Sequence, residues 1–109
     1  MMSPDSGWLH DMLSSAERAL SYTNGFALAE FMADLKTQDA VLWRLAVIGE
    51  AANNVSAQTR RAIPLEWSDI IGMRHVVVHH YRKLLMPRIW STVREDLPGL
   101  ITEIEAYLA

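Results

Sequence analysis

The sequence predicts an all-α fold, an up-and-down bundle of four to five helices that forms a single domain over residues 1–109. Three observations support this prediction. Apolar residues recur at helical spacing along most of the chain, no stretch alternates like a β-strand, and Gly, Pro and Asn separate the helical segments. Hydrophobic residues make up 50% of the chain, which indicates a globular domain rather than a disordered one.

The first helix is expected at residues 6–22, where apolar residues recur at every third or fourth position. The pair Asn24-Gly25 follows this segment and has the composition of a turn. A second, short helix is expected near residues 26–34.

The third helix is expected to begin at Thr37 or Gln38 and to run through the segment AVLWRLAVIGEAANNV. Gly49 inside it costs up to ~1 kcal/mol relative to alanine, so the close approach of another backbone would explain its presence. Glu50 follows in apolar surroundings and is either a functional acid or a partner of a neighbouring helix. We favour the second interpretation, because buried polar groups are usually paired.

Ser56 is suited to cap a short helix in the segment SAQTRRAI, which Pro64 ends. The next helix is expected to begin at Trp67 or Ser68 and to cover residues 68–84. This helix carries most of the residues that indicate a function.

The last helix should begin near Pro87, because proline is favoured in the first turn of a helix. The apolar pattern continues to about Leu108. Pro98 lacks a backbone donor and must therefore kink or divide this helix.

Charge is unevenly distributed, although the net charge of the chain is only −3. Residues 60–94 hold seven basic and two acidic side chains, a net charge of +5, and the rest of the chain carries −8. Local charge decides whether a phosphate is attracted, so this segment could bind nucleic acid. The basic residues are Arg60, Arg61, Arg74, Arg82, Lys83, Arg88 and Arg94.

The composition also excludes several classes of protein. Without cysteine there can be neither a disulfide framework nor a thiolate metal site. No apolar run approaches the length of a membrane span, and the start of the chain lacks the pattern of a secretory signal. We therefore expect a cytoplasmic protein with no membrane partner. Four tryptophans and an excess of apolar residues indicate an oligomer.

The stretch GMRHVVVHHYRKLL, residues 72–85, places an arginine, three histidines and a tyrosine around three valines. One interpretation is an ordinary surface helix whose valines pack inward. A second is a metal site, because His75 and His79 are separated by one helical turn. No third ligand is evident nearby and no HExxH pattern exists, so we expect no metal and no cofactor.

The third interpretation is phosphate chemistry. The guanidinium of Arg74 matches two phosphate oxygens, and an imidazole can move protons near neutral pH. An arginine and a histidine are sufficient kinds of side chain for RNA cleavage without a metal ion. On an ideal helix Arg74 and Tyr81 share a face, but His79 is rotated by about 140° from Arg74. Either the helix frays near His79, or two chains bring their stretches together about a two-fold axis.

The residues around this stretch resemble a known family. Arg74, His79 and Tyr81 fit the Arg-x4-His-x-Tyr motif of HEPN-domain toxins of the HepT type. The segments TQDAVLWRLAVIGEAANNVS, PLEWSDIIGMRHVVVHHY and IWSTVREDLPGL are similar to that family's segments in the same order. The similarity covers nearly the whole chain.

The resemblance implies a HEPN bundle that acts as a homodimer and as a metal-independent endoribonuclease, the toxin of a toxin–antitoxin pair. It implies that the partner is a minimal nucleotidyltransferase of the MntA type, which silences the toxin by attaching AMP to Tyr81. Arg74 and His79 would be the catalytic pair, and Tyr81 would also contact RNA. We assign supporting roles to His75, His80 and Glu50, and phosphate binding to Arg82 and Lys83.

The chain departs from the family at one position. Members often carry an aspartate four residues after the tyrosine, where this chain has Leu85. Any contact made by that acid is therefore in doubt. The alternative function is a non-catalytic HEPN module that binds a nucleotide or a protein.

Overall fold

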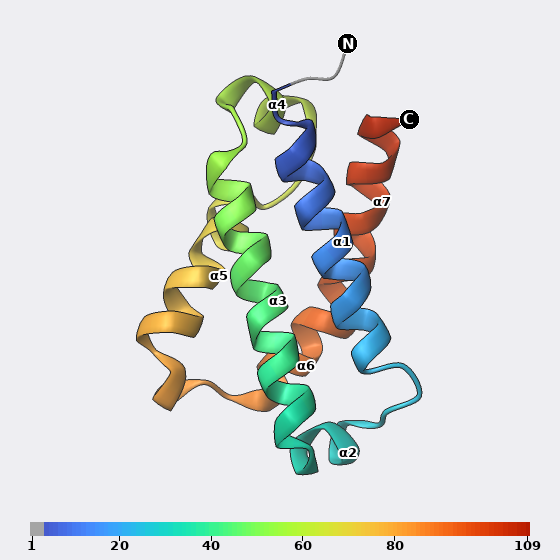
Figure 1. Cartoon of the computed structure of the whole chain (residues 1–109), viewed down its shortest axis with the longest axis vertical. Helices are drawn as coiled ribbons and strands as arrows, with labels where there is room; N and C mark the ends of the chain where they lie inside the picture. Colours follow the sequence, from blue (N-terminus) through green and yellow to red (C-terminus); the bar gives the residue numbers. More distant parts are fainter. Residues whose placement is uncertain (1–3) are drawn as a thin grey trace.

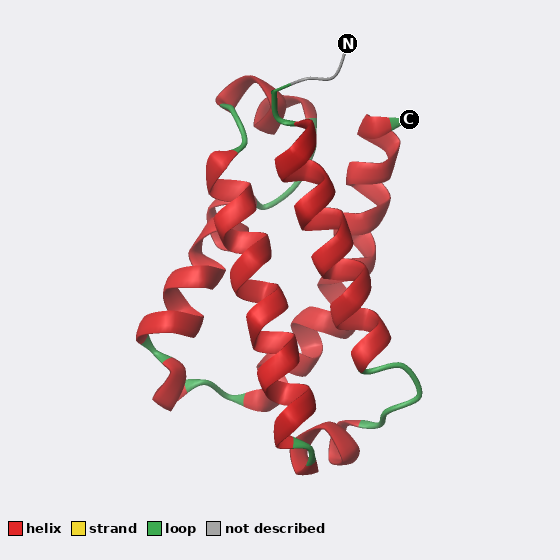
Figure 2. Cartoon of the chain, in the orientation of Figure 1, coloured by secondary structure: helices red, strands yellow, loops and turns green. Residues whose placement is uncertain are grey.

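The computed structural model describes residues 4–109, so the first three residues of the expected domain lie outside the described part. The all-α prediction is confirmed, since the described residues form helices and turns and no strand (Figure 2). The four longest helices run alternately down and up in Figure 1, as an up-and-down bundle requires. They are α1 (Ser6–Tyr22), α3 (Leu35–Asn54), α5 (Trp67–His79) and α7 (Leu97–Leu108).

Short helical segments connect the ends of the long helices. They are α2 (Leu28–Ala33), α4 (Ala57–Ala62), the 3-10 turn η1 (Tyr81–Lys83), α6 (Met86–Ser91) and the π-helical turn η2 (Thr92–Asp96). No helix within residues 4–109 is both long enough and apolar enough to cross a membrane.

Several predicted boundaries are confirmed. The first helix has the predicted ends, and Gly25 has a φ of 79°, as a turn glycine does. The hydroxyl of Ser56 accepts a hydrogen bond from the backbone N–H of Thr59, which caps α4. Pro98 lies in the first turn of α7, and the predicted final helix is divided into α6, η2 and α7.

Two predictions of helix ends were wrong. The third helix begins earlier, at Leu35, because the carboxylate of Asp34 accepts a hydrogen bond from the N–H of Thr37 and caps it. The helix predicted over residues 68–84 ends at His79, since the backbone of His80 leaves the helical region. Three consecutive β-branched valines precede this end and favour the helix less than unbranched residues would.

Asp5 connects the start of α1 to the start of α4. Its buried carboxylate accepts hydrogen bonds from the backbone N–H of Ser56 at 3.1 Å, from the hydroxyl of Ser56 at 2.6 Å and from the hydroxyl of Thr59 at 2.5 Å. The Ser56 and Thr59 hydroxyls and the Ser56 N–H hold the pKa of Asp5 below its ordinary value, with a smaller contribution from the positive charge of Arg60, although burial opposes this.

The core lies where α1, α3 and α7 meet, and α5 packs principally on α3 at the edge of the bundle (Figure 1). None of the residues of α5 is fully buried. This helix therefore presents a large surface to its surroundings. The largest fully buried side chains are Phe31, Leu9, Met12, Leu45, Ile48, Ile63, Leu97, Ile104, Val41, Val93 and Thr23.

Candidate active site

Helix α5 is held against α3 by a close backbone contact at Gly49. A Cβ at this position would lie 2.8 Å from the backbone nitrogen of Arg74 and 3.0 Å from the carbonyl oxygen of Ile70. Only glycine permits this approach without a shift of one helix. The predicted reason for Gly49 is confirmed, and the backbone that it admits is that of the motif arginine.

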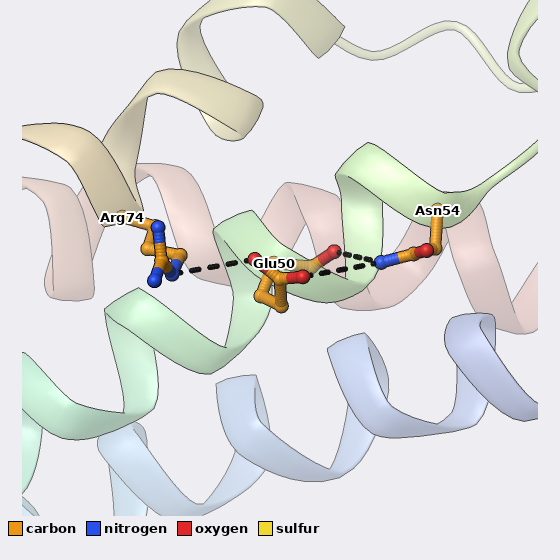
Figure 3. A network of polar contacts seen from close by, with 3 residues as sticks. All are labelled: Glu50, Asn54 and Arg74. Atoms are coloured by element: carbon orange, nitrogen blue, oxygen red, sulfur yellow. Dashed lines mark hydrogen bonds and ion pairs between the residues drawn. The ribbon is translucent and has the colours of Figure 1, made fainter.

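The neighbouring residue, Glu50, forms an ion pair with Arg74 across the same helix contact (Figure 3). Its Oε2 lies 3.3 Å from the Nε of Arg74. The side-chain amide of Asn54 donates to the main-chain oxygen of Glu50 at 2.9 Å and to its Oε1 at 3.4 Å. The prediction that Glu50 contacts a neighbouring helix is confirmed. Its apolar surroundings were predicted wrongly, because its side chain is 54% exposed.

Three imidazoles gather at the end of α5. The ring of His75 lies 4.8 Å from the ring of His79 and 5.2 Å from that of His80, measured between ring centroids. His75 and His79 are one turn apart, and the end of the helix at His79 allows the ring of His80 to approach His75 as well. All three side chains are exposed, so the cluster is open to a ligand.

The next residues form the turn η1 and project basic and aromatic groups into solvent. Tyr81 is 63% exposed, and Arg82 and Lys83 are exposed beside it. The predicted helical face shared by Arg74 and Tyr81 was wrong, because the α-helix ends before Tyr81. The basic character predicted for this segment remains at the surface.

A groove of about 510 Å³ lies between α5, η1 and α6. Most of its lining is apolar, and Lys83 and Arg88 contribute positive charge while Asp69 contributes a negative one. Leu85, which replaces the aspartate usual in the resembled family, is exposed and lines this groove. The departure therefore makes the groove more apolar than an acid would.

Within one chain, the two predicted catalytic residues have different neighbours. The Arg74 side chain pairs with Glu50 of α3, whereas the His79 ring lies against His75. This agrees with the 140° offset expected on one helix. Within residues 4–109, no three Asp, Glu or His side chains are grouped so that they could hold a metal ion.

An exposed arginine and clustered imidazoles at the end of α5 thus lie next to an exposed tyrosine in η1. The model of the family described as "Ribonuclease HepT-like" matches residues 12–107. The chain belongs to the HepT-like ribonuclease family. The family resemblance inferred from the sequence is thus confirmed.

Curated relatives agree with this HepT-like assignment. A protein of Thermococcus cleftensis named "Probable ribonuclease HepT" is 32% identical over 99 residues, which cover 90% of each chain. A protein of Methanocaldococcus jannaschii named "Putative RNase MJ0127" is 34% identical over 99 residues, which cover 90% of this chain and 82% of the relative. No solved structure is significantly similar to the chain.

Two features of this HepT-like site were missed from the sequence. Asn54 follows Glu50 by four residues, a spacing that places both side chains on one helix face and could have identified the pair. Arg88 was counted only as part of a basic segment, although it lines the groove beside Lys83. No sequence signal indicated the groove, because its walls come from separate elements.

Proposed function

We propose that this HepT-like chain is a metal-independent endoribonuclease that acts as a homodimer of single-domain HEPN chains. The observation that carries the proposal is the exposure of all three motif residues, Arg74 and His79 on α5, which has no buried residue, and Tyr81 in the turn η1. A chain that used Arg74, His79 and Tyr81 only for packing would bury at least part of them. Family membership supports a HEPN-type ribonuclease function.

In the proposed reaction the 2′-oxygen of one nucleotide loses its proton and attacks the adjacent phosphorus. The bond from phosphorus to the 5′-oxygen of the next nucleotide breaks, and that oxygen takes a proton. The products are a 2′,3′-cyclic phosphate and a 5′-hydroxyl. His79 acts as the general base or the general acid, and Arg74 holds the phosphate and stabilises the charge that develops on it.

Dimerisation would bring Arg74 and His79 together, although the two side chains have different neighbours within one chain. Val78 lies between Arg74 and His79 along α5 and is 44% exposed, so the motif surface carries apolar area. Packing two copies of α5 about a two-fold axis would cover this area and join the Arg74 of one copy to the His79 of the other. Arg82 and Lys83 would extend the positive surface for the RNA backbone.

We further propose that the protein is a cytoplasmic toxin whose antitoxin is a minimal nucleotidyltransferase of the MntA type. This partner would attach AMP to the exposed phenol of Tyr81. The added phosphate would sit beside basic residues of η1 and repel an incoming RNA backbone.

The test is incubation of the purified protein with single-stranded RNA in the presence of a chelator. We expect fragments that end in a 2′,3′-cyclic phosphate, and we expect none from His79→Ala. If the wild-type protein binds RNA under these conditions but does not cleave it, the alternative applies. The chain would then be a non-catalytic HEPN module that binds a nucleotide or a protein.

A further inference from the structure

We propose that Glu50 is a positioning residue for Arg74 and the counter-ion that an RNA phosphate replaces. The inference rests on the proposed ribonuclease function and extends it to a residue outside the Arg-x4-His-x-Tyr motif. In the RNA-free protein the carboxylate holds the guanidinium at the α3–α5 contact. In the complex with RNA, a phosphate replaces the carboxylate as the anionic partner of the guanidinium.

The carboxylate of Glu50 is itself oriented from both sides. Its Oε2 faces the Nε of Arg74 at 3.3 Å, and its Oε1 accepts from the side-chain amide of Asn54 at 3.4 Å (Figure 3). The same amide donates to the main-chain oxygen of Glu50 at 2.9 Å, and this second hydrogen bond holds the Asn54 side chain against α3. Glu50 thus acts on Arg74 from a defined place on α3.

The backbone of Arg74 is fixed by the residue before Glu50. A Cβ at Gly49 would come within 3.3 Å of the Cβ of Arg74 as well as within 2.8 Å of its nitrogen, so the two helices touch at this point. Gly49 therefore fixes the position of the Arg74 backbone, and Glu50 fixes the position of its guanidinium. Such placement lowers the entropy lost when the guanidinium binds a phosphate.

The Arg74–Glu50 ion pair contributes little to the stability of the fold, and an RNA phosphate can replace its carboxylate. The side chains of Arg74 and Glu50 are 51% and 54% exposed, and exposed pairs contribute little to stability. A phosphate offers oxygens to two guanidinium donors at once, which makes a stronger contact than a single pair with Nε. RNA can therefore displace Glu50, and the carboxylate weakens RNA binding slightly.

The counter-ion role predicts tighter RNA binding by Glu50→Gln, which removes the charge but keeps the shape. The Kd for single-stranded RNA with 2′-O-methyl groups throughout, which this chemistry cannot cleave, should fall by roughly twofold to fivefold. KM for cleavable RNA should fall with it. The kcat should change no more than it does in Glu17→Gln, because the phosphate has already replaced the carboxylate in the complex from which kcat is measured. Glu17→Gln, which removes the same charge from the exposed face of α1, is the matched control.

The change in RNA affinity caused by Glu50→Gln must also depend on Arg74. In a protein that carries Arg74→Gln, adding Glu50→Gln should change the Kd for the 2′-O-methyl RNA by no more than Glu17→Gln does. Equal Kd values for Glu50→Gln and Glu17→Gln would overturn the inference, as would a Kd change that survives in Arg74→Gln. If wild-type protein binds RNA without cleaving it, the proposed ribonuclease function fails, whereas an Arg74-dependent gain in affinity would still support the counter-ion role.

Discussion

The backbone nitrogen of Arg74 lies so close to Gly49 that a Cβ at position 49 would be only 2.8 Å from it. The motif arginine is therefore located by a main-chain contact between α3 and α5, before its side chain forms any interaction. This contact connects the stability of the fold to the geometry of the candidate site.

Gly49→Ala should destabilise the protein and lower RNA cleavage together. The added methyl meets backbone atoms of Arg74 and Ile70, which cannot move without shifting a helix. Overpacking of this kind costs ~1–3 kcal/mol, and the better helix propensity of alanine returns at most ~1 kcal/mol. Urea denaturation measures the change in the free energy of unfolding.

Gly99→Ala in α7 is the matched control, since a Cβ there would meet nothing within 4 Å. It should leave cleavage unchanged and should not lower stability. A Gly49→Ala protein as stable and as active as Gly99→Ala would show that α3 and α5 leave room for a methyl group at this contact.

The sequence predicted the helices better than it predicted the site. Apolar periodicity located the first helix, and Pro98 marked the division of the last one, because both effects are local. The end of α5 at His79 was missed, since Tyr81 and Leu84 continue the helical spacing of Val77 beyond it, and the weaker helix propensity of the three valines was not considered. The exposure of Glu50 was also missed, because neighbours along the chain do not reveal which side of a helix contact faces solvent.

His79→Ala should reduce RNA cleavage by ~10²–10⁴ through loss of proton transfer, without loss of helicity. His75→Ala should reduce it much less, because this ring contacts His79 and His80 and is assigned a supporting role. Single-turnover rates and circular dichroism measure both effects. Complete inactivation by His75→Ala in a folded protein would mean that the proton-transfer role belongs to His75.

The carboxylate of Asp5 should make the stability of the fold depend on pH in the acidic range. Hydrogen bonds from the Ser56 and Thr59 side chains lower its pKa in the folded protein, so the charged form stabilises the fold. This contribution is complete above the ordinary value near pH 4 and is lost as the pH falls through the lowered pKa. Asp5→Asn should therefore be less stable than wild type by about 1.5–3 kcal/mol at pH 7.

The difference between Asp5→Asn and wild type should shrink below about pH 4. Thermal unfolding across this range measures it. A constant difference at all pH values would assign the role of Asp5 to hydrogen-bond geometry rather than to its charge.

Val78→Glu should disrupt the proposed homodimer. Val78 is 44% exposed on α5, and a carboxylate there would be present on both copies, so two like charges would replace an apolar contact near the two-fold axis. Light scattering should give the mass of a monomer, and cleavage should be lost with it. Leu35→Glu, at an exposed apolar position at the start of α3, should leave the dimer intact. A dimeric Val78→Glu protein, or a monomeric wild type, would place the interface elsewhere or remove it.

Tyr81 should be the position at which a partner nucleotidyltransferase silences the protein. Its phenol is 63% exposed in η1, so a second enzyme can reach it, and Arg82 and Lys83 can bind the phosphate of an attached AMP. The protein is co-expressed with a minimal nucleotidyltransferase of the MntA type, and its intact mass is measured. We expect the mass of added AMP in wild type and in Tyr107→Phe, which alters another exposed tyrosine, but not in Tyr81→Phe. RNA cleavage should fall only where the mass increases. Loss of toxicity without any added mass would show that the partner acts by binding alone.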